Sequence, residues 1–365
     1  MTFPVTYAQI LQRVDAVNPV QYAKTRNFTD GAVTYLSPYI SRGVISTKQV
    51  LQAVLKKGYK PYQIEKFIQE LAWREYFQRV WQAKGNMIWQ DLKQEQQDVH
   101  HFEMMDALEN ASTGIDAIDK HILKLYETGY MHNHVRMYVA SIACNTGKAH
   151  WKMPAQWMYY HLLDGDAASN NCSWQWVAGA FSSKKYYCNQ ENINKYTYSH
   201  QRQTFMDQSY DIIPLIEVPQ VLTPVKAIQL KSHLPQTELP EIDAEKPILL
   251  YNSYNLDPCW RAQDDAHRVL LLEPSHFENN PVSKKVIDFI IQLSANIPNI
   301  QLYCGEVDAL AAQVASVSPN KKPVFISKEH PAFTHYPGNK DERDWMFPQV
   351  TGYYNSFFAF WKKCE

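Results

Sequence analysis

The pattern of apolar residues changes near residue 204, and this change limits the fold more than any other feature of the chain. Before it, apolar residues recur at helical spacing, as in Ile64, Phe67, Ile68 and Leu71. The same kind of pattern marks segments 62–82, 115–125, 133–144 and 154–163. Because little before residue 200 alternates as a strand would, residues 1–203 are predicted to be all-α.

Beyond residue 203 the chain first becomes proline-rich and then alternates between strand-like and helix-like patterns. The prolines between 214 and 240 predict an extended linker over 204–246. Strand-like and helix-like runs then follow in turn, at 248–251, 268–272, 283–295, 300–303, 307–316 and 324–327. This alternation predicts a parallel sheet covered by helices over 247–365. The expected fold is multidomain, with a helical domain, the linker and a smaller Rossmann-like α/β domain.

Composition and missing motifs argue against several classes of protein. With 45% apolar and 20% charged residues, the chain is globular rather than disordered. No apolar run approaches the roughly 20 residues of a membrane-spanning helix, and the start shows no signal-peptide pattern. The six cysteines form no CxxC pair, which disfavours zinc, iron–sulfur and disulfide sites and favours a reducing cytoplasm. The GxGxxG, GxxxxGK, HExxH and GxSxG motifs are all missing.

The charge is distributed unevenly along the chain. Residues 1–203 carry 22 Lys and Arg against 17 Asp and Glu, whereas residues 204–365 carry 14 against 20. A mildly basic half is compatible with a polyanionic partner but does not require one.

Four clusters of polar and aromatic residues in the helical half are candidates for chemistry. They occupy segments 33–43, 70–77, 129–137 and 164–176. In the first, Thr34, Ser37 and Ser41 precede helical sequence, where hydroxyls either cap a helix or complete an anion site.

The second and third clusters each place functional groups on one helix face. Glu70, Trp73 and Arg74 fall at i, i+3 and i+4, which brings a carboxylate, an indole and a guanidinium together. The alternative is an ordinary Glu70–Arg74 salt bridge beside a core tryptophan. The third cluster combines Asn133, Arg136 and Met137. Its two histidines, His132 and His134, diverge on a helix and make a poor pair of metal ligands.

The fourth cluster packs two aspartates, two asparagines and two indoles into thirteen residues, 164–176. Such residues are unusual in a helix interior, so this segment is expected to be a binding loop, with a purely structural loop as the alternative. Asp164 and Asp166 resemble part of a magnesium site, but no partner carboxylates recur at the required spacing.

Taken together, the four clusters resemble a known family. TYLSPYISRGVIS, ELAWREYF, TGYMHNHVRM and LLDGDAASNNCSWQWVAG are similar, in order and spacing, to the FAD-binding helical domain of the photolyase/cryptochrome family. The similarity covers about residues 20–185. It implies a flavoprotein that binds FAD in a U-shaped conformation.

The resemblance also implies which residues bind FAD. Tyr22, Thr34 and Ser37 would hold the diphosphate and ribose region with Arg26 close by, and Arg74 would lie near both flavin and DNA. Beside the flavin ring the resemblance places Asn133, Arg136, Asp164, Asp166 and Asn170, the last of these facing N5.

A second set of residues implies the substrate. Repair enzymes for cyclobutane pyrimidine dimers line their lesion pocket with residue types found here at Glu70, Trp73, Asn133, Met137 and Trp176. A flipped-out dimer needs flat apolar walls and a few hydrogen-bonding groups, which these side chains supply. The resemblance therefore implies light-driven repair of UV-damaged DNA. The alternatives are a cryptochrome-type photoreceptor without repair and a flavoprotein with another redox task.

The chain departs from the family pattern in three places. Trp174 and Trp151 match the first two members of the family's electron-transfer chain. The third has no counterpart: its position falls near residues 98–99, so either Trp89 or a tyrosine replaces it or photoreduction is slow. The stretch 186–192 also differs. Finally, the family's α/β antenna domain precedes the helical domain, whereas here an α/β segment follows it, either as a permuted domain or as a structural cover.

Overall fold

The computed structural model describes residues 2–365, in which eleven α-helices precede residue 200. They are α1 (Tyr7–Asp15), α2 (Pro19–Thr25), α3 (Ser37–Ser41), α4 (Thr47–Leu55), α5 (Glu65–Lys84), α6 (Asp106–Glu109), α7 (Asp116–Thr128), α8 (Asn133–Ser141), α9 (Lys152–His161), α10 (Ala167–Ala178) and α11 (Gln190–Thr197). One short antiparallel pair, β1 (Met104–Met105) with β2 (Val225–Lys226), joins this region to later sequence. The predicted helical character is confirmed apart from that pair.

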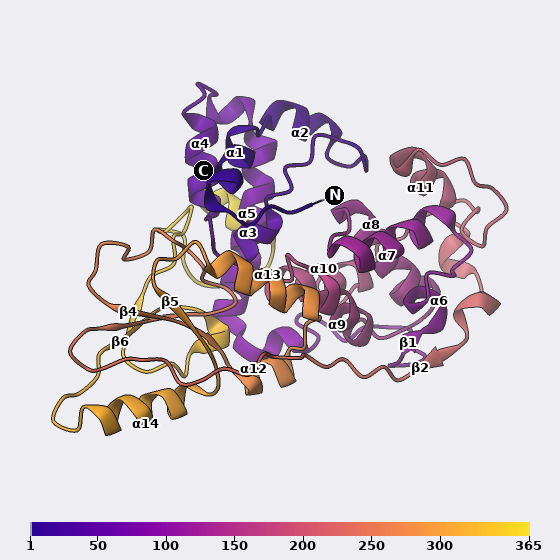
Figure 1. The fold of residues 1–365 in the computed structure, drawn as a ribbon. Coiled ribbons are helices and arrows are strands. Elements are labelled where there is room, and N and C mark those ends of the chain that lie inside the picture. The colour runs from indigo at the N-terminus through magenta and orange to yellow at the C-terminus, as the bar shows by residue number, and fades with distance from the viewer. Residues whose placement is uncertain (1) are drawn as a thin grey trace.

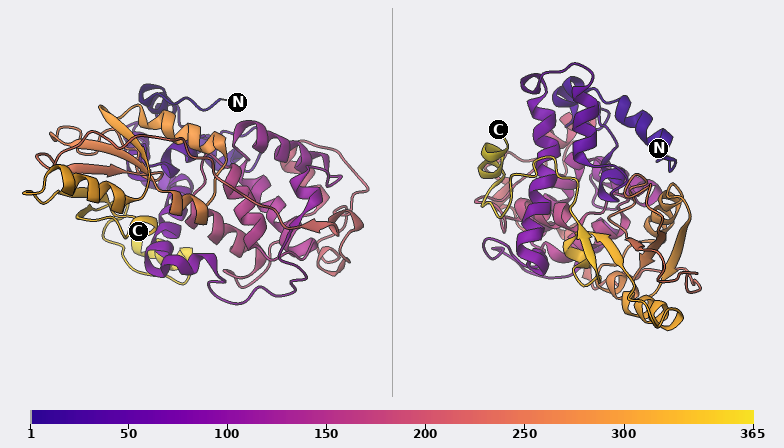
Figure 2. Two further views of the ribbon diagram at one scale, coloured as in Figure 1. Left: turned by 60° about the horizontal axis from the view of Figure 1, so that its bottom comes forward. Right: turned by 90° about the vertical axis from the view of Figure 1, so that its left-hand side faces the viewer.

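Helix α5 is the longest element, and it is buried along more than one face. Phe67, Ile68 and Ala72 are buried, as are the polar side chains of Glu75 and Gln78. A helix of 20 residues spans about 30 Å, long enough to contact several other elements. It therefore forms a central axis of the molecule, visible in purple in the right panel of Figure 2.

Most of the fourth cluster is helical, so the expectation of a loop was right only for residues 164–166 and wrong for 167–176. Residues 167–178 form α10, and Asp166 is its N-cap, accepting a hydrogen bond from the backbone N–H of Ser169 at 2.7 Å. The helix ends at Gly179, whose φ of 85° lies in the left-handed region. Neighbouring helices bury α10, so tertiary packing outweighs the weak helical propensity of its asparagines, serines and tryptophans.

The predicted parallel sheet is present, with five strands in the order β5-β4-β3-β6-β7. The strands are β3 (Ile248–Tyr251), β4 (His267–Leu272), β5 (Ile300–Cys304), β6 (Phe325–Lys328) and β7 (Asn339–Asp341). All four residues of the central strand β3 are buried, as expected where helices cover both faces of a parallel sheet. Leu249 pairs with Arg268 of β4 on one side and Ile326 of β6 on the other.

Four helices occur in the C-terminal part: α12 (Pro274–Asn279), α13 (Lys284–Ser294), α14 (Val307–Val317) and α15 (Phe357–Cys364), of which α15 packs against α5. The segments 283–295 and 307–316 predict α13 and α14 closely. Strand β7 was not predicted because Asn, Lys and Asp carry no β pattern, and α12 and α15 were missed as well. Figure 1 shows the sheet at the lower left with α14 beyond it, and α6–α11 on the right.

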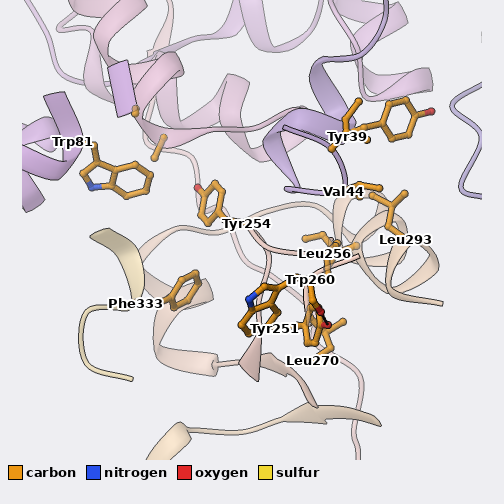
Figure 3. Packing of buried hydrophobic residues seen from close by; sticks show 14 of the residues in the cluster. Tyr39, Val44, Trp81, Tyr251, Tyr254, Leu256, Trp260, Leu270, Leu293 and Phe333 are labelled. Carbon is orange, nitrogen blue, oxygen red and sulfur yellow. Dashed lines mark hydrogen bonds between the residues drawn. The ribbon is translucent and has the colours of Figure 1, made fainter. Parts of the chain in front are cut away.

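The buried residues form two clusters that divide the chain differently from its sequence pattern. One combines α1, α4 and α5 with the whole sheet, and the other lies within residues 104–222. Figure 3 shows the junction in the first cluster, where Trp81 of α5 faces Tyr254 from the loop after β3. Their ring centroids are 5.8 Å apart. The sheet is therefore packed directly against the N-terminal helices.

Residues 204–246 hold little regular structure, namely two single-turn 3-10 helices and β2. In Figure 1 this stretch runs from β2 along the lower edge of the molecule toward the sheet. The division into domains at 203 and 247 stays a prediction. Among residues 2–365, no helix has both the length and the apolar character needed to cross a membrane.

Candidate functional site

A cavity of about 470 Å³ opens among α5, α8, α10 and the segment 22–40. This volume falls within the roughly 300–1,000 Å³ typical of small-molecule sites. All five residues implied for the substrate, and every residue implied for the cofactor except Arg26, line it: Tyr22, Thr34, Ser37, Glu70, Trp73, Arg74, Asn133, Arg136, Met137, Asp164, Asp166, Asn170 and Trp176. Three helices and the segment 22–40, far apart in sequence, thus bring the four clusters to one place.

Two ion pairs fix charged groups in the cavity wall. The Nη2 of Arg136 donates to both carboxylate oxygens of Asp164, at 3.0 and 2.9 Å. The Nη2 of Arg74 donates to Asp166 at 2.9 Å, and Gln78 donates to the same oxygen at 2.5 Å. Because both aspartates are buried, each pair holds its guanidinium in a defined position.

Glu70 pairs with Arg26 at the end of α2, and Lys66, one turn earlier in α5, lies 3.9 Å from the same carboxylate oxygen. The Glu70 carboxylate accepts from the Nε of Arg26 at 3.1 Å, while Arg74 turns to Asp166. Glu70 and Arg74 therefore do not form the salt bridge that was the alternative for this cluster, because each has another partner. Arg26 does not line the cavity itself, but it contacts the wall through Glu70.

Neutral polar groups complete the wall. The amide of Asn170 donates to the carbonyl of Ala155 at 3.0 Å, which fixes the orientation of its side chain. Burial raises the pKa of Tyr22 and of Tyr130, so both phenols stay protonated at neutral pH. The hydroxyl of Ser169 is buried against the cavity with no hydrogen-bond partner within residues 2–365. A buried polar atom of this kind calls for a partner in the cavity.

Flat apolar side chains form the rest of the lining. Trp73 and Met137 lie within the cavity wall, and Trp176 is 38% exposed at its rim. Trp73 also stacks on Phe357 of α15, with ring centroids 3.8 Å apart and an angle of 10° between planes. Nothing in the sequence pattern indicated Phe357, because its partner lies in a distant part of the chain.

The two tryptophans of the implied electron-transfer chain occupy different positions. Trp174 lines the cavity, whereas Trp151 is fully buried outside it and donates its indole N–H to Asp91 at 2.6 Å. The ring of His150 lies 5.7 Å from Trp151 and stacks with Phe102, which is exposed. Trp89 packs against the buried cluster that contains α5 and the sheet, whereas Trp151 belongs to the cluster within residues 104–222.

The two histidines at the start of α8 are uncharged parts of the packing. Burial lowers the pKa of both His132 and His134 to about 4. The Nδ1 of His132 accepts from the backbone N–H of His134 at 3.2 Å. No cluster of three or more His, Cys, Asp or Glu side chains in residues 2–365 has the arrangement of a metal site.

Comparison with known proteins shows what the segment that forms much of this cavity is similar to. Residues 67–211 match the family model described as the FAD binding domain of DNA photolyase. Deoxyribodipyrimidine photo-lyase of Streptomyces griseus is 31% identical over 149 residues, which is 40% of this chain and 32% of that protein. Cryptochrome DASH of Danio rerio is 32% identical over 173 residues, covering 43% of this chain and 32% of its own length.

Among solved structures, a Synechocystis cryptochrome has 25% sequence identity and a TM-score of 0.47, over 54% of this chain and 44% of its own. The chain spans about a third of the length of the curated relatives it matches. Relatives named as repair enzymes and as cryptochromes both occur, so these matches do not separate the two activities.

Proposed function

We propose that this chain, a member of the photolyase/cryptochrome family through its FAD-binding domain, splits cyclobutane pyrimidine dimers in DNA under light. The observation that supports repair is that Glu70, Trp73, Asn133, Met137 and Trp176 all line the same cavity as the residues implied for FAD. A cavity for the cofactor alone does not need this second set.

The residues present fit FAD. Its flat ring systems match the apolar lining, its diphosphate matches the hydroxyls of Thr34 and Ser37, and the unpaired hydroxyl of Ser169 supplies a hydrogen bond. The Arg136–Asp164 pair and Asn170 would lie beside the flavin ring. When bound, FAD supplies the light-driven electron donation that opens the cyclobutane ring and accepts the electron back, with no net redox change.

The chain's own residues would bind and orient the lesion. Trp73 and Trp176 offer flat apolar surfaces to a flipped-out pyrimidine dimer, and Met137 adds a polarisable thioether. Asn133 and Glu70 supply hydrogen-bonding groups for base carbonyl and imide atoms. The Arg26–Glu70 hydrogen bond holds the Glu70 carboxylate toward α2, so its position is set by the protein.

The alternative is a photoreceptor of cryptochrome type, which would keep photoreduction of the flavin without repair. Trp174 lies in the cavity wall and Trp151 is fully buried nearby in sequence, an arrangement that suits photoreduction whether or not DNA is repaired. Photoreduction without repair would support this alternative.

Repair is tested by illuminating chemically reduced protein with an oligonucleotide that contains one thymine dimer and following loss of the dimer. We expect turnover, and we expect Trp73→Ala to weaken binding of the damaged oligonucleotide by about 1–3 kcal/mol while sparing FAD content. Trp157→Phe, a buried tryptophan that does not line the cavity, is the matched control. No loss of dimer by wild-type protein that carries reduced FAD would contradict the proposal.

A further inference from the structure

We propose that the C-terminal strap, residues 342–365, positions Trp73 for substrate contact and that Phe357 is the positioning residue. The role of Trp73 in binding the lesion rests on the proposed function. The geometry of the strap does not, because it follows from contacts between the end of the chain and α5.

The strap leaves the sheet at β7 and is hydrogen-bonded to α5 along the polar side chains that point away from the cavity. The backbone N–H groups of Met346 and Phe347 donate to the carboxylate of Glu75, at 2.7 and 2.8 Å. Tyr76 donates to the carbonyl of Tyr354 at 3.1 Å. In the right panel of Figure 2 the yellow end of the chain lies beside the long purple helix.

A second set of contacts links the start of the strap to the cavity wall. The Nη1 of Arg343 donates to Gln78 at 2.6 Å, and Gln78 donates to Asp166, the partner of Arg74. The guanidinium of Arg79 lies over the ring of Trp345, 3.6 Å from its centroid. Helix α5 is therefore held between the cavity on one side and the strap on the other.

Phe357 is the point at which the strap contacts a cavity residue directly. It is the first residue of α15, which Ser356 caps by accepting from Ala359 N–H at 3.2 Å. The ring of Phe357 is 2% exposed and lies almost parallel to the indole of Trp73. Trp361, one turn later, stacks with Phe357 at 6.2 Å and 16°, which supports it from the same helix.

Stacking at 3.8 Å covers one face of the indole and fixes its plane. The part of Trp73 that lines the cavity then keeps one orientation before any substrate arrives. Binding a flat base against a fixed wall avoids the loss of side-chain freedom that a mobile indole would incur. A segment at the end of the α/β part thus prepares a surface in the helical part.

Fluorine NMR tests the positioning without relying on activity. Protein labelled with 5-fluorotryptophan is compared with Phe357→Ala, and the Trp73 resonance is assigned with Trp73→Phe. Loss of the stacked ring should shift that resonance, whereas Phe358→Ala, at a neighbouring position that is 63% exposed, should leave it in place. An unchanged Trp73 resonance in Phe357→Ala would overturn the inference. Phe357→Leu, which keeps most of the volume, gives the same test if the alanine variant does not fold.

The functional arm measures binding of dimer-containing and undamaged oligonucleotides by FAD-loaded protein. We expect Phe357→Ala to weaken binding of the damaged strand about three- to tenfold, with FAD content and binding of undamaged DNA unchanged. Equal affinity for the damaged strand would count against positioning while leaving repair intact. If wild-type protein shows no preference for damage, the proposed function fails, and the fluorine resonance alone decides whether the strap orders Trp73.

Discussion

At the scale of single residues, Asp166 shows how one side chain serves both the fold and the site. It caps α10, accepts from Gln78 and pairs with Arg74 in the cavity wall. A capping residue needs only a hydrogen-bond acceptor, whereas the ion pair needs the negative charge. The two roles can therefore be separated by substitution.

We predict that Asp166→Asn keeps most of the stability but weakens FAD binding, because asparagine caps helices well and cannot pair with Arg74. Asp166→Ala should lose both, with an additional loss of about 1 kcal/mol in the free energy of unfolding for the missing cap. Thermal denaturation and flavin content of purified protein measure the two effects. Equal stability of the two variants would show that the cap contributes little.

A second residue-scale prediction concerns Trp174. Trp174→Phe should slow photoreduction of the flavin while leaving repair by chemically reduced protein largely intact, because the proposed electron-transfer chain uses this indole only during photoreduction. Absorption spectra recorded during blue illumination with a reductant give the rate. Loss of repair in the chemically reduced variant would assign Trp174 to substrate or cofactor binding instead.

At the scale of elements, the junction between α3 and the loop after β3 depends on a close approach of backbone. Gly43 has φ +63°, and a Cβ there would lie 2.2 Å from the carbonyl oxygen of Tyr254. The residue before Gly43 also joins the two elements, because the backbone N–H of Leu256 donates to the carbonyl of Arg42 at 2.9 Å. Only glycine meets both conditions, positive φ and lack of a side chain.

Gly43→Ala is expected to lower the free energy of unfolding by more than about 1 kcal/mol, since it adds a steric clash to backbone strain. Gly58→Ala is the matched control, because φ is +91° there but no atom lies within 4 Å of the added Cβ. Urea denaturation of both variants separates the clash from the strain. If the free energy of unfolding decreases no more in Gly43→Ala than in Gly58→Ala, the two elements can move apart to accommodate the added Cβ, and the prediction is wrong.

At the scale of the whole molecule, buried histidines link stability to pH. Burial lowers the pKa of His132, His134, His161 and His276 to about 4, and lowers that of His330, stacked on Tyr254, well below its usual value. His330 contacts Trp81 of α5 as well as Tyr254, and His276 packs against Phe333. The folded protein therefore binds fewer protons than the unfolded chain, in which histidine titrates near 6.5.

The free energy of unfolding should be greatest above pH 6.5 and should fall as the pH decreases from 6.5 toward 4. Burial raises the pKa of Glu75 and of Glu273, and these carboxyls offset part of the loss by taking up protons more readily when folded. Denaturant titrations at several pH values measure the slope, and His276→Gln should reduce it. A stability independent of pH over this range would contradict the assignment of neutral histidines.

The sequence by itself determined which segments form α5, α7–α9 and the strands β3–β6, because their periodic patterns lie within short stretches of chain. It also placed most of the polar and aromatic residues that line the cavity within four motifs. Only the tertiary structure decided that Glu70 pairs with Arg26, that residues 167–178 are helical, and that Phe357 stacks on Trp73. These features depend on contacts between residues far apart in the chain, and such contacts cannot be predicted from local sequence patterns.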